Sequence, residues 1–315
     1  MLTYHFYFHC KDDRWYHEDF ELEQQIKSKG FNVELFFTGD ADIDLQNRQI
    51  KRLAGSNVDA LVIGSLMVMP YPLKDAKAKS IPVISYDRLI TGTDAVTYYV
   101  SFDNQQVCKI QGQYLIDKLK PTVDDPKNIE IFYGSLDDKN DLFFYEEAMQ
   151  ILKPYINSGA LVVKSGKISP NETNVPGWRT DLASKRMDEI LDTVGYGASG
   201  GVKLDGILSP ADCLSDGIIF TLKKKGYTPS NIPVITGQDA TAEALQNVKE
   251  GYQAMTIYKS RDDLHDAVID IVRSISSGKK ANINDTTTYN NGVKDMDSFP
   301  CTPELIDRSN LAKLL

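Results

Sequence analysis

The sequence has few of the residues that build metal and redox centres. Among 315 residues it has four cysteines and four histidines, and it has no C-x-x-C pair. The cysteines stand far apart, at Cys10, Cys108, Cys213 and Cys301. His5 and His9 are four residues apart, but the strand predicted there separates them by about 13 Å, too far to share a metal ion. These spacings exclude zinc clusters and thioredoxin-like redox sites, so we expect no metal and no cofactor.

Long apolar runs are also absent. The longest, 60–69, is interrupted by Gly64 and Ser65 and is shorter than the ~20 apolar residues that a membrane-spanning helix needs. The N-terminus, 1–8, has no basic region and no small-residue cleavage site, so it is predicted to form the first strand of the fold. From these features alone, the protein is either cytoplasmic or lacks a targeting or anchoring segment.

Basic residues are outnumbered by acidic ones. Thirty-five Lys and Arg against 44 Asp and Glu give a net charge of −9. Because an acidic surface repels phosphate backbones, we expect no nucleic acid partner. Thirteen prolines and 21 glycines are ordinary numbers, which excludes a disordered or collagen-like chain. At about 150 residues per domain, the length predicts two domains.

Short apolar runs alternate with amphipathic helical patterns along most of the chain. The first series has predicted strands at 31–37, 60–64 and 81–86, with predicted helices at 19–29, 45–55 and 73–79. The second series has predicted strands at 129–133, 161–163, 206–208 and 233–235, with predicted helices at 143–155, 180–194, 214–225 and 240–250. A strand at 253–258 and a helix at 261–276 follow. Two consecutive series of this kind predict an α/β protein with two doubly wound, mostly parallel, Rossmann-like lobes.

One glycine motif imitates a dinucleotide-binding fingerprint. The segment 195–200 matches G-x-G-x-x-G, but it closes a helix and precedes a strand, whereas nucleotide binding needs the reverse order. We therefore expect a flexible surface loop there. The sequence has no P-loop, no H-E-x-x-H and no G-x-S-x-G, so no catalytic set is predicted and the protein is not expected to be an enzyme.

Polar side chains follow the strands of both series at the point where each strand ends. These residues are Arg14, Trp15, Asp87, Arg88, Asp137, Asp138, Asn140, Asp212, Gln238, Asp239 and Lys259. In open parallel sheets, ligands bind beyond the carboxyl ends of the strands. A mixture of carboxylate, amide and cationic groups suits a neutral polyol, because each hydroxyl donates once and accepts twice. A phosphate ligand would instead need an excess of cations.

The only two tryptophans favour the same ligand class. Trp15 and Trp178 lie in predicted loops beside Arg14 and Arg179, and a flat indole matches the apolar face of a sugar. Phe143 and Phe144 are further aromatic candidates.

Each candidate also has a purely structural interpretation. The adjacent residues Asp87 and Arg88 are typical of a solvated ion pair, and Trp178 is typical of a plug at the edge of a core. Asp212 and Asp239 are typical of helix N-caps. The recurrence of such residues at matching strand ends favours ligand binding over these alternatives.

Two other classes of protein remain as alternatives. A glycosidase would need two carboxyl groups ~5–9.5 Å apart across the scissile bond, and the sequence offers no dedicated pair. A sugar-responsive repressor would need an N-terminal helix-turn-helix and a basic face, which 1–30 does not supply.

Motifs spread over nearly the whole chain resemble those of the substrate-binding proteins of sugar ABC transporters. The resemblance is to the xylose-binding branch, which includes the multiple-sugar binders. The matching motifs are Arg14-Trp15, Ser85-Tyr86-Asp87-Arg88-Leu89-Ile90, Ser101-Phe102-Asp103-Asn104, Gly134-Ser135 with Asp138 and Asn140, Leu152-Lys153-Pro154-Tyr155, Gly177-Trp178, Gly237-Gln238-Asp239-Ala240, Tyr258-Lys259 and Asn290-Asn291-Gly292-Val293-Lys294.

The resemblance implies a type I periplasmic binding protein fold with the sugar in a cleft between two lobes. It implies one lobe of 1–103 plus 260–285 and another of 104–259 plus 286–315. The chain would cross a three-stranded hinge near Phe102–Asp103, Tyr258–Lys259 and Asp285–Thr286. The residues implied to contact the sugar are Arg14, Trp15, Asp87, Arg88, Asn140, Trp178, Asp212, Asp239 and Lys259.

The resemblance also implies where the protein works and with which partner. We expect an extracytoplasmic receptor, in the periplasm or at the cell surface, whose export or anchor segment is missing from this sequence. The expected ligand is D-xylose first and another aldose second, and the expected partner is a membrane permease. The alternative is a membrane-anchored xylose sensor that signals to a two-component histidine kinase.

Two departures from the family pattern concern the choice of sugar. The family usually has Asp-Asn-Asn where this chain has Asp138, Lys139 and Asn140. It often has Asn or Tyr before the residue that matches Asp212, whereas this chain has Ala211. The smaller side chain leaves room for a water molecule or for another hydroxymethyl group.

Overall fold

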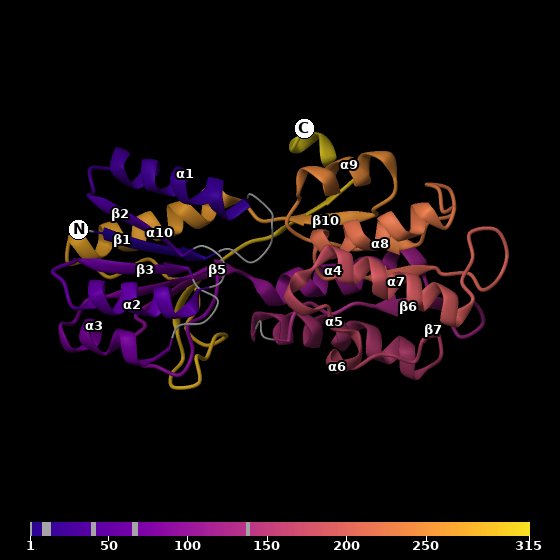
Figure 1. Cartoon of the computed structure of the whole chain (residues 1–315), viewed down its shortest axis with the longest axis horizontal. Coiled ribbons are helices and arrows are strands. Elements are labelled where there is room, and N and C mark those ends of the chain that lie inside the picture. Colours follow the sequence, from indigo (N-terminus) through magenta and orange to yellow (C-terminus); the bar gives the residue numbers. More distant parts are fainter. Residues whose placement is uncertain (1, 8–13, 39–41, 65–68, 137–138) are drawn as a thin grey trace. The chain divides into compact units, whose positions relative to one another are not determined.

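The computed structural model describes residues 2–7, 14–38, 42–64, 69–136 and 139–315 (Figure 1). The chain divides into two compact units. Unit 1 consists of Met1–Asp103 and Ser260–Cys301, and unit 2 consists of Asn104–Lys259 and Thr302–Leu315. The chain therefore passes from one unit to the other three times.

Unit 1 is built on a six-stranded sheet whose neighbouring strands are all parallel. Its strand order is β11-β5-β4-β3-β1-β2. The strands are β1 (Leu2–Tyr7), β2 (Val33–Thr38), β3 (Ala60–Gly64), β4 (Val83–Tyr86), β5 (Tyr98–Phe102) and β11 (Asp297–Cys301). The helices are α1 (Arg14–Ser28), α2 (Ile43–Ala54), a 3-10 turn (Tyr71–Leu73), α3 (Lys74–Ala78) and α10 (Arg261–Ser276). In Figure 1, α1 and α10 lie on one face of the sheet, and α2 and α3 lie on the other.

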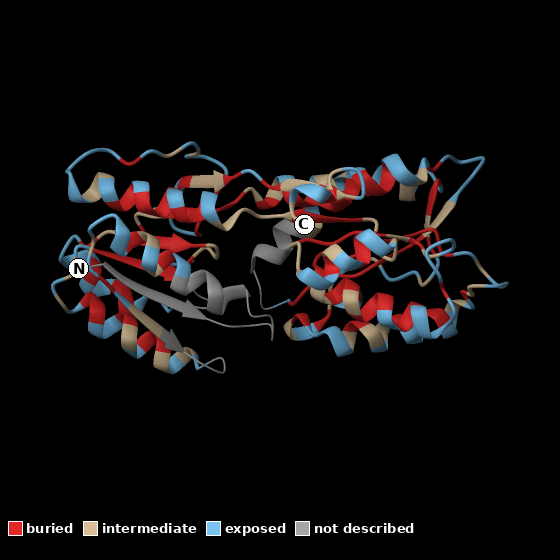
Figure 2. Cartoon of the chain, turned by 90° about the horizontal axis from the view of Figure 1, so that it is seen from above, coloured by how far each residue is buried: buried red, intermediate tan, exposed pale blue. Residues whose placement is uncertain are grey.

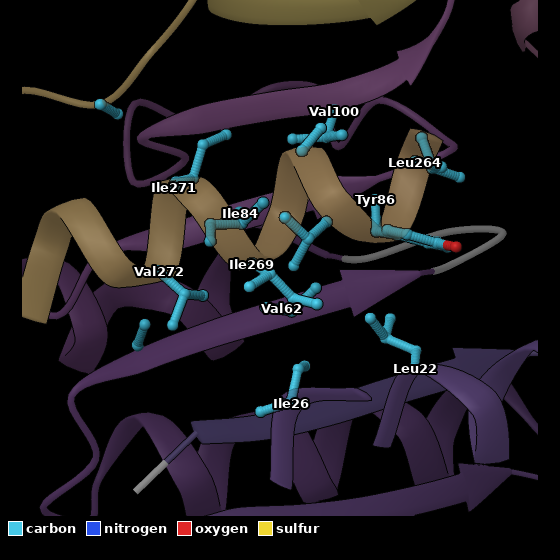
Figure 3. Close-up of a cluster of buried hydrophobic side chains, with 14 of the residues drawn as sticks. Leu22, Ile26, Val62, Ile84, Tyr86, Val100, Leu264, Ile269, Ile271 and Val272 are labelled. Atoms are coloured by element: carbon cyan, nitrogen blue, oxygen red, sulfur yellow. The ribbon is translucent and has the colours of Figure 1, made fainter. Parts of the chain in front are cut away.

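Both faces of this sheet are buried, as expected for a parallel sheet between helices. All five residues of β3 are buried. On one face, Leu264 and Val272 of α10 pack with Leu22 of α1 against Val62 and Ile84 of the strands (Figure 3). Most of the helices have one buried side and one exposed side, as the burial colours of Figure 2 show.

Unit 2 has a parallel four-stranded sheet and a separate antiparallel pair. The sheet order is β7-β6-β8-β9, and β10 pairs with β12. The strands are β6 (Lys127–Ile131), β7 (Leu161–Val163), β8 (Gly206–Leu208), β9 (Val234–Ile235), β10 (Met255–Tyr258) and β12 (Glu304–Asp307). The helices are α4 (Asn104–Leu119), α5 (Lys139–Asn157), α6 (Pro170–Thr173), α7 (Thr180–Val194), α8 (Asp212–Lys224) and α9 (Ala242–Glu250), with 3-10 turns at Pro176–Trp178 and Leu311–Lys313.

These two parallel sheets confirm the predicted fold class. Three strands were not predicted, namely β5, β11 and β12. The third passage between the units lies at Cys301–Thr302 rather than near Asp285–Thr286, because β11 pairs with β5 and completes the sheet of unit 1. Trp15, predicted to lie in a loop, is in the first turn of α1.

The glycine motif at 195–200 is more firmly held than predicted. Gly195 ends α7 in the left-handed conformation, with a φ of 77°. Tyr196 is buried, and its hydroxyl donates a 2.9 Å hydrogen bond to Oε1 of Glu130, which is itself buried in β6. The glycines at 200 and 201 are exposed. The motif is therefore a surface loop, as predicted, and hydrogen bonds hold several of its residues.

Within the described ranges, no helix combines the length and the apolar character needed to cross a membrane. The same residues contain no group of three or more His, Cys, Asp or Glu side chains that could hold a metal ion.

Candidate ligand-binding site

Strained backbone occurs in the turns that follow two of the strands, β4 and β9. Six described non-glycine residues have positive φ angles: Ser80, Asp87, Lys120, Trp178, Asp239 and Ala240. Three of them, Asp87, Trp178 and Asp239, are predicted to contact the ligand. Such a conformation costs of the order of 1–3 kcal/mol and persists only where surrounding contacts hold it. Strained residues are often found at ligand sites, so the positive φ angles of Asp87, Trp178 and Asp239 are consistent with the contact roles predicted for them.

In unit 1, the turn after β4 presents Asp87 and Arg88. Asp87 has a φ of 59°, and its carbonyl oxygen accepts hydrogen bonds from Tyr99 Oη at 3.0 Å and Ser101 Oγ at 2.7 Å. The carbonyl oxygen of Arg88 accepts a 2.6 Å hydrogen bond from Ser85 Oγ. Side chains of β4 and β5 thus fix this turn, and both Asp87 and Arg88 are half-buried at the carboxyl end of the sheet.

For three other residues that are predicted to contact the ligand, the structure describes the backbone alone. Arg14 and Trp15 are the first two residues of α1, which follows β1. Asn140 is the second residue of α5, which follows β6. These positions lie after strand ends, as predicted, but the three side chains are outside the described part of the structure. Asp137 and Asp138 are outside it entirely.

In unit 2, Trp178 belongs to a turn that is tied to the end of β6. Val175 N donates to Tyr133 O at 3.1 Å, and Gly177 N donates to Ser135 Oγ at 2.8 Å. Trp178 is 8% exposed. This burial is compatible with stacking on a ligand and with the predicted alternative of a core plug. The neighbouring Arg179 is exposed and forms an ion pair with Asp181.

Asp239 and Lys259 are brought together by neighbouring elements. Asp239 follows β9 and Lys259 follows β10, and Asp239 N donates to Ile257 O at 2.9 Å. Lys259 Nζ lies 2.6 Å from Asp239 Oδ1, and the two side chains are 9% and 22% exposed. This pair offers an ammonium donor and a carboxylate acceptor in a region mostly shielded from water.

Asp212, another residue that is predicted to contact the ligand, has different surroundings from Asp239. Its side chain is fully buried at the first position of α8. The carboxylate accepts hydrogen bonds from Gln253 Nε2 at 2.8 Å, Thr256 Oγ1 at 2.8 Å and Thr241 N at 3.2 Å. Burial, and then the charge of Asp239, raise the pKa of Asp212 well above its usual range. In this structure the carboxylate has no exposed surface to offer a ligand.

Sequence reasoning missed the residues that hold these turns. Ser85, Tyr99 and Ser101 support the turn of unit 1, and Gln253 and Thr256 support that of unit 2. The available signal was the presence of polar side chains inside or beside otherwise apolar strand runs. Such residues need a buried partner, and here the partner is a site turn.

The chain is similar to a known protein family over most of its length. The family model described as a periplasmic binding protein domain matches residues 6–280. The multiple sugar-binding periplasmic protein SbpA of Azospirillum brasilense is 38% identical, over 94% of this chain and 83% of its own. The D-xylose-binding periplasmic protein of Escherichia coli is 29% identical, over 95% of this chain and 84% of its own.

A solved structure is similar over the whole chain. It is an ABC transporter solute-binding protein from Clostridium phytofermentans with bound β-D-glucose. It superimposes with a TM-score of 0.90 at 36% identity and covers 100% of this chain and 96% of its own. All three proteins are named as binding proteins and none as an enzyme, in agreement with the expectation that this chain is not an enzyme.

Proposed function

Because the chain belongs to the periplasmic binding protein family, we propose that it is an extracytoplasmic receptor that binds one monosaccharide and delivers it to an ABC transporter. The family membership agrees with the resemblance drawn from the motifs. The relatives named for transport favour a permease as the partner over a sensor histidine kinase.

The observation that carries the proposal is the coincidence of strained turns with predicted contact residues. Asp87 in unit 1 and Asp239 in unit 2 follow strands and have positive φ, and Trp178 has positive φ in a 3-10 turn that is hydrogen-bonded to the segment after β6. The side chains of both turns are chemically matched to sugar hydroxyls, since carboxylates accept protons from hydroxyls and cations donate to their oxygens. Hydrogen bonds to charged groups contribute ~1.5–3 kcal/mol each, so a few of them reach micromolar affinity, about −8 kcal/mol.

We propose that the sugar is held by residues of both units. In unit 1 these are Arg14, Trp15, Asp87 and Arg88, and in unit 2 they are Asn140, Trp178, Asp239 and Lys259. A ligand that contacts both units favours whichever arrangement makes both sets of contacts at once, and it shifts the population by its differential affinity for that arrangement. The liganded arrangement is then the form that the permease recognises.

We propose aldopyranoses as the ligand class, with D-glucose accepted beside D-xylose. The two sugars differ by one hydroxymethyl group on the ring. Ala211, the N-cap residue of α8, is buried and carries only a methyl group, which leaves room for this substituent. The multiple-sugar and glucose-bound relatives support this breadth.

Isothermal titration calorimetry tests the proposal. The titrants are D-xylose, D-glucose, D-galactose and L-arabinose, with myo-inositol as a polyol that has no anomeric centre. We expect D-xylose and D-glucose to bind, and Ala211→Asn to weaken D-glucose more than D-xylose. The absence of heat with every aldose would reject the proposal.

A further inference from the structure

We propose that Asp212 is a positioning residue: it holds the strained turn that presents Asp239, and it supports sugar binding without touching the sugar. This inference rests on the proposed function, because its affinity measurements use a monosaccharide. The Asp212 carboxylate has no exposed surface in this structure, and the inference gives this buried group a role other than direct contact with the sugar.

The turn in question cannot hold its own shape. Asp239 has a φ of 103° and Ala240 a φ of 50°, so two consecutive non-glycine residues occupy the region that favours glycine. L-residues adopt this region rarely, and they keep it only when neighbouring contacts impose it. We therefore expect hydrogen bonds to hold the residues before and after Asp239 and so to keep its positive φ angle.

Hydrogen bonds from Asp212 reach the turn on both sides. Before Asp239, the backbone N of Asp212 donates to Gln238 O at 3.0 Å. After it, Oδ2 of Asp212 accepts from Thr241 N at 3.2 Å. Oδ2 also accepts from Thr256 Oγ1 at 2.8 Å, and that same hydroxyl oxygen accepts from Ala240 N at 3.1 Å. One side chain thus fixes the two residues after Asp239, while its backbone fixes the residue before.

The start of the turn is packed directly against this carboxylate. A Cβ placed on Gly237 would lie 2.1 Å from Asp212 Oδ1 and 2.5 Å from Gln253 Nε2, so only glycine fits. Gln253 Nε2 holds Oδ1 at 2.8 Å and also donates to Met255 O at 3.0 Å, which ties the carboxylate to β10. The side chain, the glycine and the strand form one buried support behind Asp239.

The consequence concerns the geometry of the Asp239–Lys259 pair. In this strained conformation of the turn, Asp239 Oδ1 lies 2.6 Å from Lys259 Nζ. If the support is lost, Asp239 and Ala240 relax toward ordinary φ angles, and the carboxylate leaves its position. Asp212 therefore acts on the sugar through Asp239.

A double-mutant cycle with Asp212→Asn and Asp239→Asn tests this route. We expect Asp212→Asn alone to raise the sugar Kd about tenfold or more, since coupled neighbours show interaction energies of this order. In the Asp239→Asn background, the same change should raise Kd less than about twofold. Equal effects in both backgrounds would overturn the proposal, because a direct contact or a general loss of structure gives additive effects. Wild-type Kd in a folded Asp212→Asn protein would overturn it as well.

Asp205→Asn is the matched control. Asp205 is also a buried aspartate of unit 2, and its Oδ2 accepts a 2.9 Å hydrogen bond from Asn128 N. It lies just before β8, at the opposite end of the strand from Asp212. We expect it to lower the melting temperature without changing Kd. If Asp205→Asn weakens binding as much as Asp212→Asn does, the role of Asp212 is merely structural.

Hydrogen exchange of the ligand-free protein gives a readout that does not depend on a sugar. Asp212→Asn should speed exchange of the amides in 237–241, whereas Asp205→Asn should not. Thr256→Val, which removes the hydroxyl between Asp212 and Ala240, should do the same and replaces Asp212→Asn if that variant does not fold. Unchanged exchange in these variants would overturn the positioning role. Failure of the wild-type protein to bind any aldose would instead reject the proposed function and leave the exchange result to decide the positioning role.

Discussion

Asp239→Asn is the variant that most directly probes the proposed site. Asparagine keeps the size of the side chain and tolerates positive φ, so the strained turn can persist. The change removes the carboxylate charge 2.6 Å from Lys259 Nζ. Its consequences for binding and for stability are separable, because one depends on the sugar and the other on the ion pair.

The magnitudes follow from the burial of the pair. Loss of a hydrogen bond between a sugar hydroxyl and a charged group costs ~1.5–3 kcal/mol, which raises Kd about ten- to hundredfold. Breaking a fully buried ion pair costs about 3–5 kcal/mol. Since Asp239 is 22% exposed, solvent screening reduces the expected loss of unfolding free energy to about 1–3 kcal/mol.

Calorimetric titration and thermal unfolding of the same preparations provide the assay. Asp181→Asn serves as the control, because its carboxylate pairs with Arg179 at the surface and is 63% exposed. Such a pair contributes about 0–1 kcal/mol to stability, and its loss should leave Kd unchanged. If a folded Asp239→Asn protein bound aldoses with wild-type Kd, the pair would lie outside the sugar site and the reasoning would be refuted.

Three further predictions concern other parts of the two units. Arg88→Ala should raise Kd about ten- to hundredfold, because a sugar oxygen loses a charged donor; unchanged titration curves would remove the turn of unit 1 from the site. Trp178→Ala should weaken binding while the melting temperature changes little; a collapse of melting temperature with unchanged affinity per folded molecule would favour the core-plug interpretation. Burial lowers the pKa of His265 to about 4; the negative charge of Asp262 opposes this shift and the positive charge of Arg261 adds to it, so the folded state holds His265 neutral. Its contribution to stability is complete above pH 6.5 and is lost by about 1.4 kcal/mol per pH unit as the pH falls from 6.5 toward 4. His265→Leu should flatten the fall in melting temperature between pH 7 and 5, and an unchanged slope would contradict the assignment.

The strands that were predicted best have a simple apolar signature. The runs at β3 and β8 coincide with the predicted ranges because both are buried apolar segments. β11 has no such signature, since Asp297–Cys301 contains a proline and a charged residue. It lies at the edge of the six-stranded sheet, where a proline without an N–H group is tolerated. Its pairing with β5 joins segments that are distant in the sequence, and no local pattern reports such a contact.

In the candidate site, too, the local sequence predicts some features, whereas others depend on residues that are distant in the chain. A polar residue after a strand is visible in the sequence, which is why Asp87, Asp239 and Lys259 could be selected. Whether such a residue faces outward or inward depends on partners elsewhere in the chain. Asp212 faces inward because Gln253 and Thr256, on a later segment, supply its donors. Asp239 and Asp212 both follow a strand, so the sequence pattern alone does not distinguish an aspartate that binds a ligand from one that supports it.

The order of segments in unit 1 has a consequence for how the molecule is made. The parallel sheet of unit 2 has all its strands once Ile235 has been synthesised, whereas the other sheet still lacks β11, in which Asp297 pairs with Tyr98. α10, which covers one face of that sheet, also comes late in the chain. The N-terminal strands thus emerge from the ribosome first, and their sheet is completed later than the parallel sheet of unit 2. Because contacts between distant segments form slowly, the part of this sheet that α10 covers and the edge that β11 pairs with stay open while the middle of the chain is translated, and this open surface favours aggregation until they arrive.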